Sequence, residues 1–118
     1  MKPIVLLAIT ILTLGFTSPA SADFADKLGK LLGYVIVDSK TIKGWYDDSQ
    51  KEEGAFKGCK HGRVIVFTDN KVLTCAAYGY QYAYRPTAVI LAKSMTYQGK
   101  TFYEFKMVVE DEIYDMRQ

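Results

Sequence analysis

The sequence has few of the residues on which catalytic and metal sites are built. Its 118 residues include one histidine, His61, and two cysteines, Cys59 and Cys75. It contains no glycine-rich phosphate-binding motif, no Gly-x-Ser-x-Gly and no histidine pair at metal-ligand spacing. Zinc would need more ligands than these three residues offer. The absences favour a non-catalytic protein, and we expect no metal and no cofactor.

An excess of charge of one sign is also missing. The chain has 15 Lys and Arg against 13 Asp and Glu, a formal net charge of +2, with both signs mixed along its length. Binding to nucleic acid or to an anionic membrane requires concentrated positive charge. Nucleic acid is therefore not an expected partner. The acidic groups at 47–48, 52–53 and 110–112 lack the alternating spacing of a calcium loop, and we interpret them as solvated charge.

The only long apolar run lies at the N-terminus, from Ile4 to Phe16, after the single charge of Lys2. At about 13 residues it is shorter than the roughly 20 that span a bilayer. Ala20-Ser21-Ala22 then supplies the small residues at −3 and −1 that signal peptidase requires. We predict a signal peptide over residues 1–22, cleaved before Asp23; an uncleaved anchor is the alternative.

Cleavage would leave residues 23–118 as one small exported domain with no membrane span. A short signal with one lysine is typical of bacterial export, which predicts the periplasm or the medium. Two cysteines in an oxidising compartment usually form a bridge. We therefore predict a Cys59–Cys75 disulfide, closing a loop of about 17 residues and contributing about 3 kcal/mol. A redox pair would normally be Cys-x-x-Cys at a helix start, which this is not.

The mature chain opens with a helical pattern and then changes to β. Apolar residues recur at helical spacing over Asp23–Leu32, and Gly33 can end the helix. Branched and aromatic residues over 34–37 and 41–46 predict one long bent strand or two short ones. The polar, glycine-containing stretch 47–58 is expected to be a mobile loop.

A first hairpin is predicted over residues 63–68 and 71–75, because Asp69-Asn70 tolerates the positive φ angles of tight turns. Cys59 would lie about 16 Å along the strand from Val64, whereas a disulfide needs Cα atoms within about 7 Å. We therefore expect residues 58–62 to fold back over the sheet, bent at Gly58 and Gly62. The predicted pairs are Val64–Cys75, Val66–Leu73 and Ile65–Thr74.

A second hairpin is predicted over 87–97 and 100–110, joined by a two-residue turn at Gln98-Gly99. The turn pairs Lys93 with Glu104 and sets small side chains opposite large ones on a packed face. This packed face pairs Ala88, Ile90, Ala92 and Ser94 with Val109, Met107, Phe105 and Tyr103. Residues 111–118, which follow the hairpin, are either a last strand or a frayed tail.

These elements predict a mainly β (α+β) fold. A short N-terminal helix precedes an antiparallel meander of about five strands, which either curls into a small barrel or is covered on one face by the helix.

The most unusual local pattern is four tyrosines at every second position from 78 to 84. Period-two spacing puts all four on one side of an extended chain. If the alternation continues from the first hairpin, they face outward and could stack on sugars or contact a protein. If Gly79 forms a bulge, some of them enter the core instead. The candidate binding residues are Tyr78, Tyr80, Tyr82, Tyr84, Arg85 and Trp45.

Our first hypothesis for function is a small exported, non-catalytic domain that binds a protein or glycan partner through these residues. A small periplasmic hydrolase that uses His61 and carboxylates is an alternative, although the sequence offers no nucleophile to complete such a site. A purely structural or stress-related envelope protein is a third. The sequence does not specify the oligomeric state.

Overall fold

A long first strand organises the protein. The computed structural model describes residues 20–118, in which β1 (Val35–Tyr46) pairs with β7 (Thr87–Tyr97) along its first half and with β4 (Val64–Phe67) along its second. Register shifts at Val37 and Lys43 mark β-bulges, which let the strand bend. One long bent strand is one of the two arrangements predicted from the sequence.

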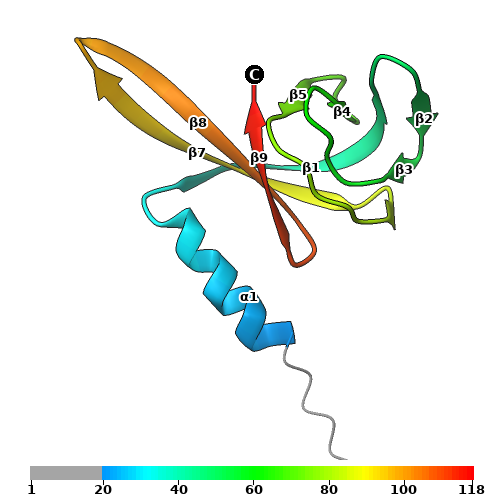
Figure 1. Ribbon diagram of the computed structural model, residues 1–118, viewed down its shortest axis with the longest axis horizontal. Helices are drawn as coiled ribbons and strands as arrows, with labels where there is room; N and C mark the ends of the chain where they lie inside the picture. The colour runs from blue at the N-terminus through cyan, green and yellow to red at the C-terminus, as the bar shows by residue number, and fades with distance from the viewer. Residues whose placement is uncertain (1–19) are drawn as a thin grey trace, which may run out of the picture.

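Six antiparallel strands close into a barrel (Figure 1). β4 pairs with β5 (Val72–Cys75), β5 with β9 (Glu112–Arg117), and β9 with β8 (Lys100–Val109); β8 then pairs with β7, which returns to β1. The mainly β fold and the small barrel are confirmed. The chain end forms the last strand rather than a frayed tail, and this strand is what closes the barrel.

The core fills the barrel interior with side chains from every strand of the wall. Inward-facing residues alternate with outward-facing ones, so each strand contributes about every second residue. The buried cluster from the wall comprises Ile42, Trp45, Ile65, Phe67, Leu73, Cys75, Ala88, Ile90, Met107, Val109, Tyr114 and Met116.

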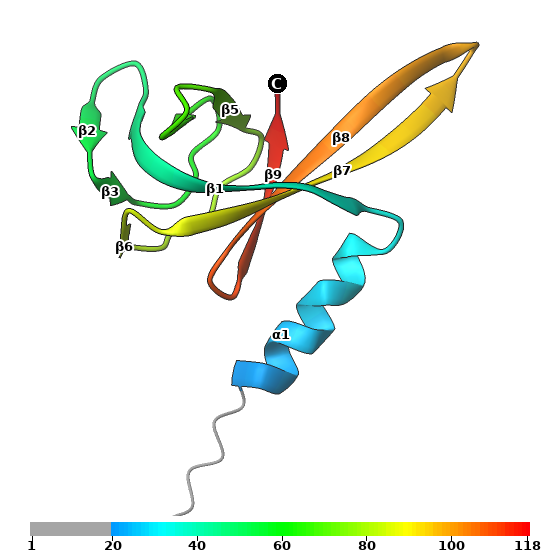
Figure 2. The same cartoon turned by 180° about the vertical axis from the view of Figure 1, so that it is seen from behind.

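The N-terminal helix does not cover the sheet. α1 (Ala20–Leu28) continues into the short 3-10 helix η1 (Gly29–Leu31) and extends away from the barrel (Figures 1 and 2). The Lys27 ammonium holds it to the start of β9, pairing with the Glu112 carboxylate at 3.0 Å. The predicted cleavage point before Asp23 falls within α1, and residues 1–19 of the predicted signal peptide lie outside the described residues.

The register predicted for the β4–β5 hairpin is wrong by one residue. Asn70 adopts a positive φ of 67°, and the Phe67 amide donates to the Lys71 carbonyl across a three-residue loop. Ile65 consequently pairs with Leu73. Ile65 and Phe67 therefore point into the core, and the two valines predicted there are only half-buried. The observed pairs are Val64–Thr74, Ile65–Leu73 and Val66–Val72.

The register predicted for the β7–β8 hairpin is confirmed throughout. Lys93 pairs with Glu104, and the turn residues Gln98 and Gly99 both have positive φ. The predicted packed face is buried only where it lines the barrel, because the hairpin is longer than the barrel wall (Figure 1). We call its projecting end, residues 93–104, the arm.

The predicted loop 47–58 contains two short strands, which corrects the sequence interpretation. β2 (Lys51–Glu53) pairs with the end of β1, and β3 (Ala55–Phe56) pairs with β6 (Ala83–Tyr84). Phe56, the second residue of β3, is fully buried. Because the stretch is largely polar, its sequence did not indicate that Phe56 anchors it in the core.

Candidate functional site

The candidate site is the segment 78–85, which runs along one end of the barrel and ends in β6. The Cys59 amide donates to the Gly79 carbonyl at 2.7 Å, and the Gly79 amide donates to the Cys59 carbonyl at 2.9 Å. Further along, Phe56 pairs with Ala83. Backbone contacts therefore hold the segment at both ends.

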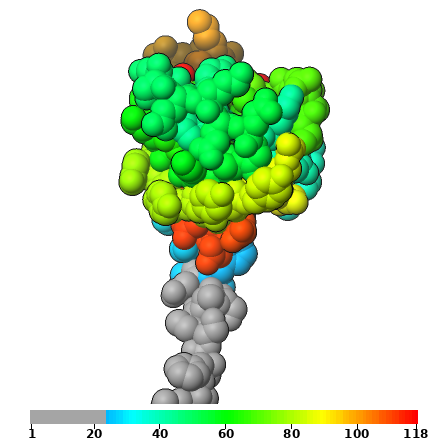
Figure 3. All heavy atoms as spheres, turned by 90° about the vertical axis from the view of Figure 1, so that its right-hand side faces the viewer, coloured from blue at the N-terminus to red at the C-terminus, as the bar shows by residue number. Residues whose placement is uncertain are grey.

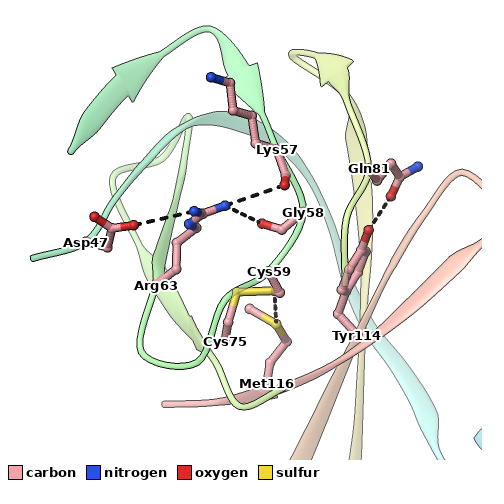
Figure 4. Close-up of a disulfide and its surroundings, with 9 residues drawn as sticks. All are labelled: Asp47, Lys57, Gly58, Cys59, Arg63, Cys75, Gln81, Tyr114 and Met116. Carbon is pink, nitrogen blue, oxygen red and sulfur yellow. Dashed lines mark hydrogen bonds and ion pairs between the residues drawn. A yellow bond between two sulfur atoms is a disulfide. The ribbon is translucent and has the colours of Figure 1, made fainter. Parts of the chain in front are cut away.

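A disulfide joins the stretch that pairs with Gly79 to the barrel wall. Cys59 is bonded to Cys75 of β5, with Cα atoms 5.5 Å apart, as predicted (Figure 4). Residues 58–62 fold back as expected, with φ angles of 81° at Gly58 and 88° at Gly62. Gly58 also lets the 58–62 stretch pass close to the backbone at Gly79, since a Cβ at Gly58 would lie 2.1 Å from the Gly79 carbonyl oxygen.

The inward-facing residues of the segment bind the barrel. The Tyr114 hydroxyl donates to Gln81 Oε1 at 2.6 Å (Figure 4), and Gln81 Nε2 donates to the Val109 carbonyl at 3.1 Å. Gly79 faces the Tyr114 ring so closely that a Cβ would lie 3.0 Å from it. Burial raises the pKa of Tyr114 above its usual value, and the charges of Glu110, Asp111 and Glu112 raise it further. Its hydroxyl therefore remains a donor at neutral pH.

The four tyrosines of the segment point outward. Their exposed fractions are 78% for Tyr78, 72% for Tyr80, 60% for Tyr82 and 72% for Tyr84. Within the described chain their hydroxyls form no hydrogen bond, which leaves them to water. We call these four residues the tyrosine face; the yellow-green segment that carries them forms a band along the lower margin of the barrel in Figure 3.

Of the two arrangements that the sequence leaves open, the structure has the uninterrupted alternation, with the four tyrosines outward. Gly79 does not reverse the sides on which the following residues lie. Its position faces inward, as do the positions of Gln81, which is half-buried, and Ala83, which is buried. The segment differs from the prediction in another way, because most of it is extended chain beside the 55–59 stretch rather than a strand of the main sheet.

Arg85 and Trp45, the other two candidates, lie in different surroundings. Arg85 is exposed, and its guanidinium lies 5.9 Å from the centre of the Tyr84 ring, so it extends the tyrosine face. Trp45 is only 2% exposed and belongs to the core. The bulge at Lys43 turns both Ile42 and Trp45 inward, which the sequence pattern did not indicate.

Arg63 is a residue that the sequence interpretation missed. Its guanidinium lies 4.0 Å above the Trp45 ring and 3.4 Å from the Asp47 carboxylate, and it points at the carbonyls of Lys57 and Gly58 (Figure 4). Backbone amides of the 47–50 turn, together with Arg63, hold the pKa of Asp47 below its usual value. These contacts hold the 47–58 stretch against the barrel, so the role of Arg63 is structural.

His61 is exposed and forms no hydrogen bond or ion pair with any residue from Phe24 onward. No group of three or more His, Cys, Asp or Glu residues in that part of the chain could hold a metal ion. The geometry therefore gives no support to a hydrolase that uses His61 with carboxylates.

Comparisons with family models, curated proteins and solved structures returned no significant match for this chain. Between Ala20 and Gln118, no helix is long and apolar enough to cross a membrane.

Proposed function

We propose that the protein is an exported, non-catalytic binding domain that contacts a protein or glycan partner through the tyrosine face. The observation that carries the proposal is the combination of four exposed tyrosines with a segment whose inward side is bonded to the barrel. A rigid support lowers the entropy lost on binding. Tyrosine adds a large amphipathic contact area with few rotatable bonds.

Two features support export. The N-terminal sequence carries the pattern of a signal peptide, cleaved before Asp23. The Cys59–Cys75 bridge belongs to a protein that meets an oxidising compartment, such as the periplasm or the medium.

The surroundings of the tyrosine face favour a ligand with negative charge. A shallow hollow beside Tyr78 and Tyr80 is lined by basic residues, among which Lys60 has no salt bridge within the described chain. Arg85 lies at the other end and is equally free of acidic partners. Aromatic rings flanked by two available cations suit an acidic glycan or an acidic protein surface.

Titration against a panel of neutral and acidic glycans and envelope proteins tests this proposal. Replacing Tyr80 and Tyr82 by alanine should abolish binding and change the free energy of unfolding by less than about 0.5 kcal/mol, since exposed residues contribute little to folding. Tyr97→Ala is the matched control, because Tyr97 is as exposed but lies on the arm, on the strand away from the open edge of β8. Binding that survives in the Tyr80/Tyr82 variant, or is lost equally in the control, would overturn the proposal.

A further inference from the structure

Within residues 20–118, the arm leaves one edge of β8 without a neighbouring strand. β9 pairs with β8 only as far as Phe105–Met116 and then continues beside β5, so residues 100–104 have a described partner strand on the β7 side alone. Figure 1 shows the two strands diverging, and a hollow lined by Tyr103, Phe105, Met116 and Arg117 lies where they part. Unpaired strand edges attract other strands.

The turn at residues 98–99 determines which backbone groups are free. Residues that flank a two-residue turn bond to each other, and the pattern alternates from there. Lys100, Phe102 and Glu104 therefore direct their backbone groups at β7. Thr101 and Tyr103 direct theirs at the open edge, as Phe105 does toward β9.

We propose that this edge pairs with the same edge of a second copy, antiparallel about a two-fold axis at Phe102. In this register Thr101 bonds to Tyr103 of the other copy and Tyr103 to its Thr101, which uses every free backbone group of both residues. Phe102, which is 51% exposed, meets its own counterpart.

Charge selects the same register. Lys100 and Glu104 lie on the side of the sheet that carries Phe102, and the antiparallel arrangement sets each Lys100 opposite the Glu104 of the other copy. The Lys100 ammonium and the Glu104 carboxylate are both available for this ion pair. Lys100 has no salt bridge in the described chain, and Glu104 uses only Oε2, which accepts from the Tyr34 hydroxyl at 2.7 Å.

The neighbouring registers pair fewer of these groups. Shifting the second copy toward the barrel sets Thr101 opposite Phe105, whose backbone groups already face β9. Shifting it toward the tip sets Tyr103 opposite Gly99 and separates the charges. In the proposed register Gly99, which has no side chain, falls opposite Phe105 at the hollow where β9 departs.

A charge exchange tests the pairing. Sedimentation velocity on the protein expressed from its full-length sequence should show a concentration-dependent dimer. Lys100→Glu and Glu104→Lys should each raise the dissociation constant at least about tenfold, because each sets like charges opposite one another twice. An equimolar mixture of the two variants should recover the dimer, since every facing pair is then opposite in sign.

A cysteine test locates the axis. Cα atoms of a non-hydrogen-bonded antiparallel pair lie about 4.5 Å apart, within the range of a disulfide. Phe102→Cys should therefore form a covalent dimer. Met95→Cys, on the neighbouring strand and similarly exposed, should not, because its counterpart is about three strand spacings away, roughly 14 Å.

Each readout can overturn the proposal. A chain that stays monomeric at all concentrations contradicts it, as does a Lys100→Glu variant that dimerises like the unmodified chain. So does a mixture of the two charge variants that stays monomeric while circular dichroism shows both to be folded, or equal cross-linking through positions 95 and 102.

Discussion

The tyrosine face and the arm both expose aromatic side chains but differ in how they are supported. Behind the tyrosine face, Gly79, Gln81 and Ala83 are each bonded or packed against the barrel. Among the residues that the structure describes, the arm beyond Phe105 is paired only through its own two strands. The first region therefore offers side chains on a fixed backbone, whereas the second also offers the backbone itself. The exposed fractions of the aromatic residues do not distinguish these two regions. The hydrogen bonds and packing of the residues behind them do.

Removing the disulfide should have the largest effect and should fall on one region. Replacing Cys59 and Cys75 by alanine is expected to lower the free energy of unfolding by about 3 kcal/mol, because it opens a loop of about 17 residues. Hydrogen exchange at the Gly79 amide should accelerate, since that amide is bonded to Cys59. Exchange within the arm should follow global stability alone. A variant that loses extra protection in both regions equally would contradict the contrast.

A pair of glycine substitutions separates steric support from backbone strain. Gly58→Ala places a Cβ 2.1 Å from the Gly79 carbonyl oxygen, whereas Gly62→Ala meets nothing within 4 Å; both glycines have positive φ. Gly62→Ala should cost about 1 kcal/mol from backbone strain alone. Gly58→Ala should lower the free energy of unfolding by about 2 kcal/mol more, because the methyl group overpacks the crossing, and should detach the tyrosine face. Denaturant unfolding measures the difference, and equal costs would show that the crossing at Gly79 is not tight.

The hydrogen bond from Tyr114 to Gln81 sharpens the comparison further. Tyr114→Phe should lower the free energy of unfolding by about 1 kcal/mol, the usual contribution of such a bond. Tyr80→Phe is the control, because the Tyr80 hydroxyl has no partner in the described part of the chain, and it should change stability by less than about 0.5 kcal/mol. If thermal unfolding places both variants at the same stability, Gln81 does not anchor the segment.

An alkaline titration examines the other region. Tyr34 lies beside the base of the arm; its burial and its bond to Glu104 raise its pKa to about 12, against 10.0 for an ordinary tyrosine. The folded state thus retains the proton more strongly than the unfolded state. The resulting stability is present below pH 10 and is lost as the pH rises from 10 toward 12.

Tyr34→Phe should reduce the alkaline loss of stability, which denaturant unfolding at a series of pH values would record. The remaining loss should come from Tyr114 and Lys40, whose pKa values are also raised. An alkaline profile that is unchanged in this variant would show that Tyr34 is not held at the arm.

Turn chemistry explains why one hairpin was predictable and the other was not. Gln98-Gly99 fits a two-residue turn with both φ angles positive, so the β7–β8 register followed directly. Asp69-Asn70 fits a two-residue turn equally well, yet the chain uses a three-residue loop in which only Asn70 has positive φ. A shift of one residue in the pairing register exchanges the two faces of a strand. Ile65 therefore lies in the core, where its neighbours Val64 and Val66 were predicted.

The candidate site was predictable to the extent that it depends on alternation. Period-two spacing put the four tyrosines on one side of the chain but left open whether that side faces solvent or the core. The disulfide was predicted from the cysteine count and the predicted compartment. Trp45 was misplaced because a bulge, which leaves no clear sequence signal, reverses the side on which a residue lies. Arg63 was missed because Trp45 and Asp47 come from the end of β1 and the turn after it, and only the folded barrel brings them to the guanidinium.

Hydroxyl-radical footprinting with and without the bound partner tests the central claim most directly. In the free protein, Tyr78, Tyr80, Tyr82 and Tyr84 should be oxidised rapidly and Tyr114, which is 5% exposed, slowly. Saturating partner should protect the four tyrosines together and leave Tyr97 on the arm unchanged. Slow oxidation of the four tyrosines in the free protein, or protection that appears on the arm instead, would contradict the account.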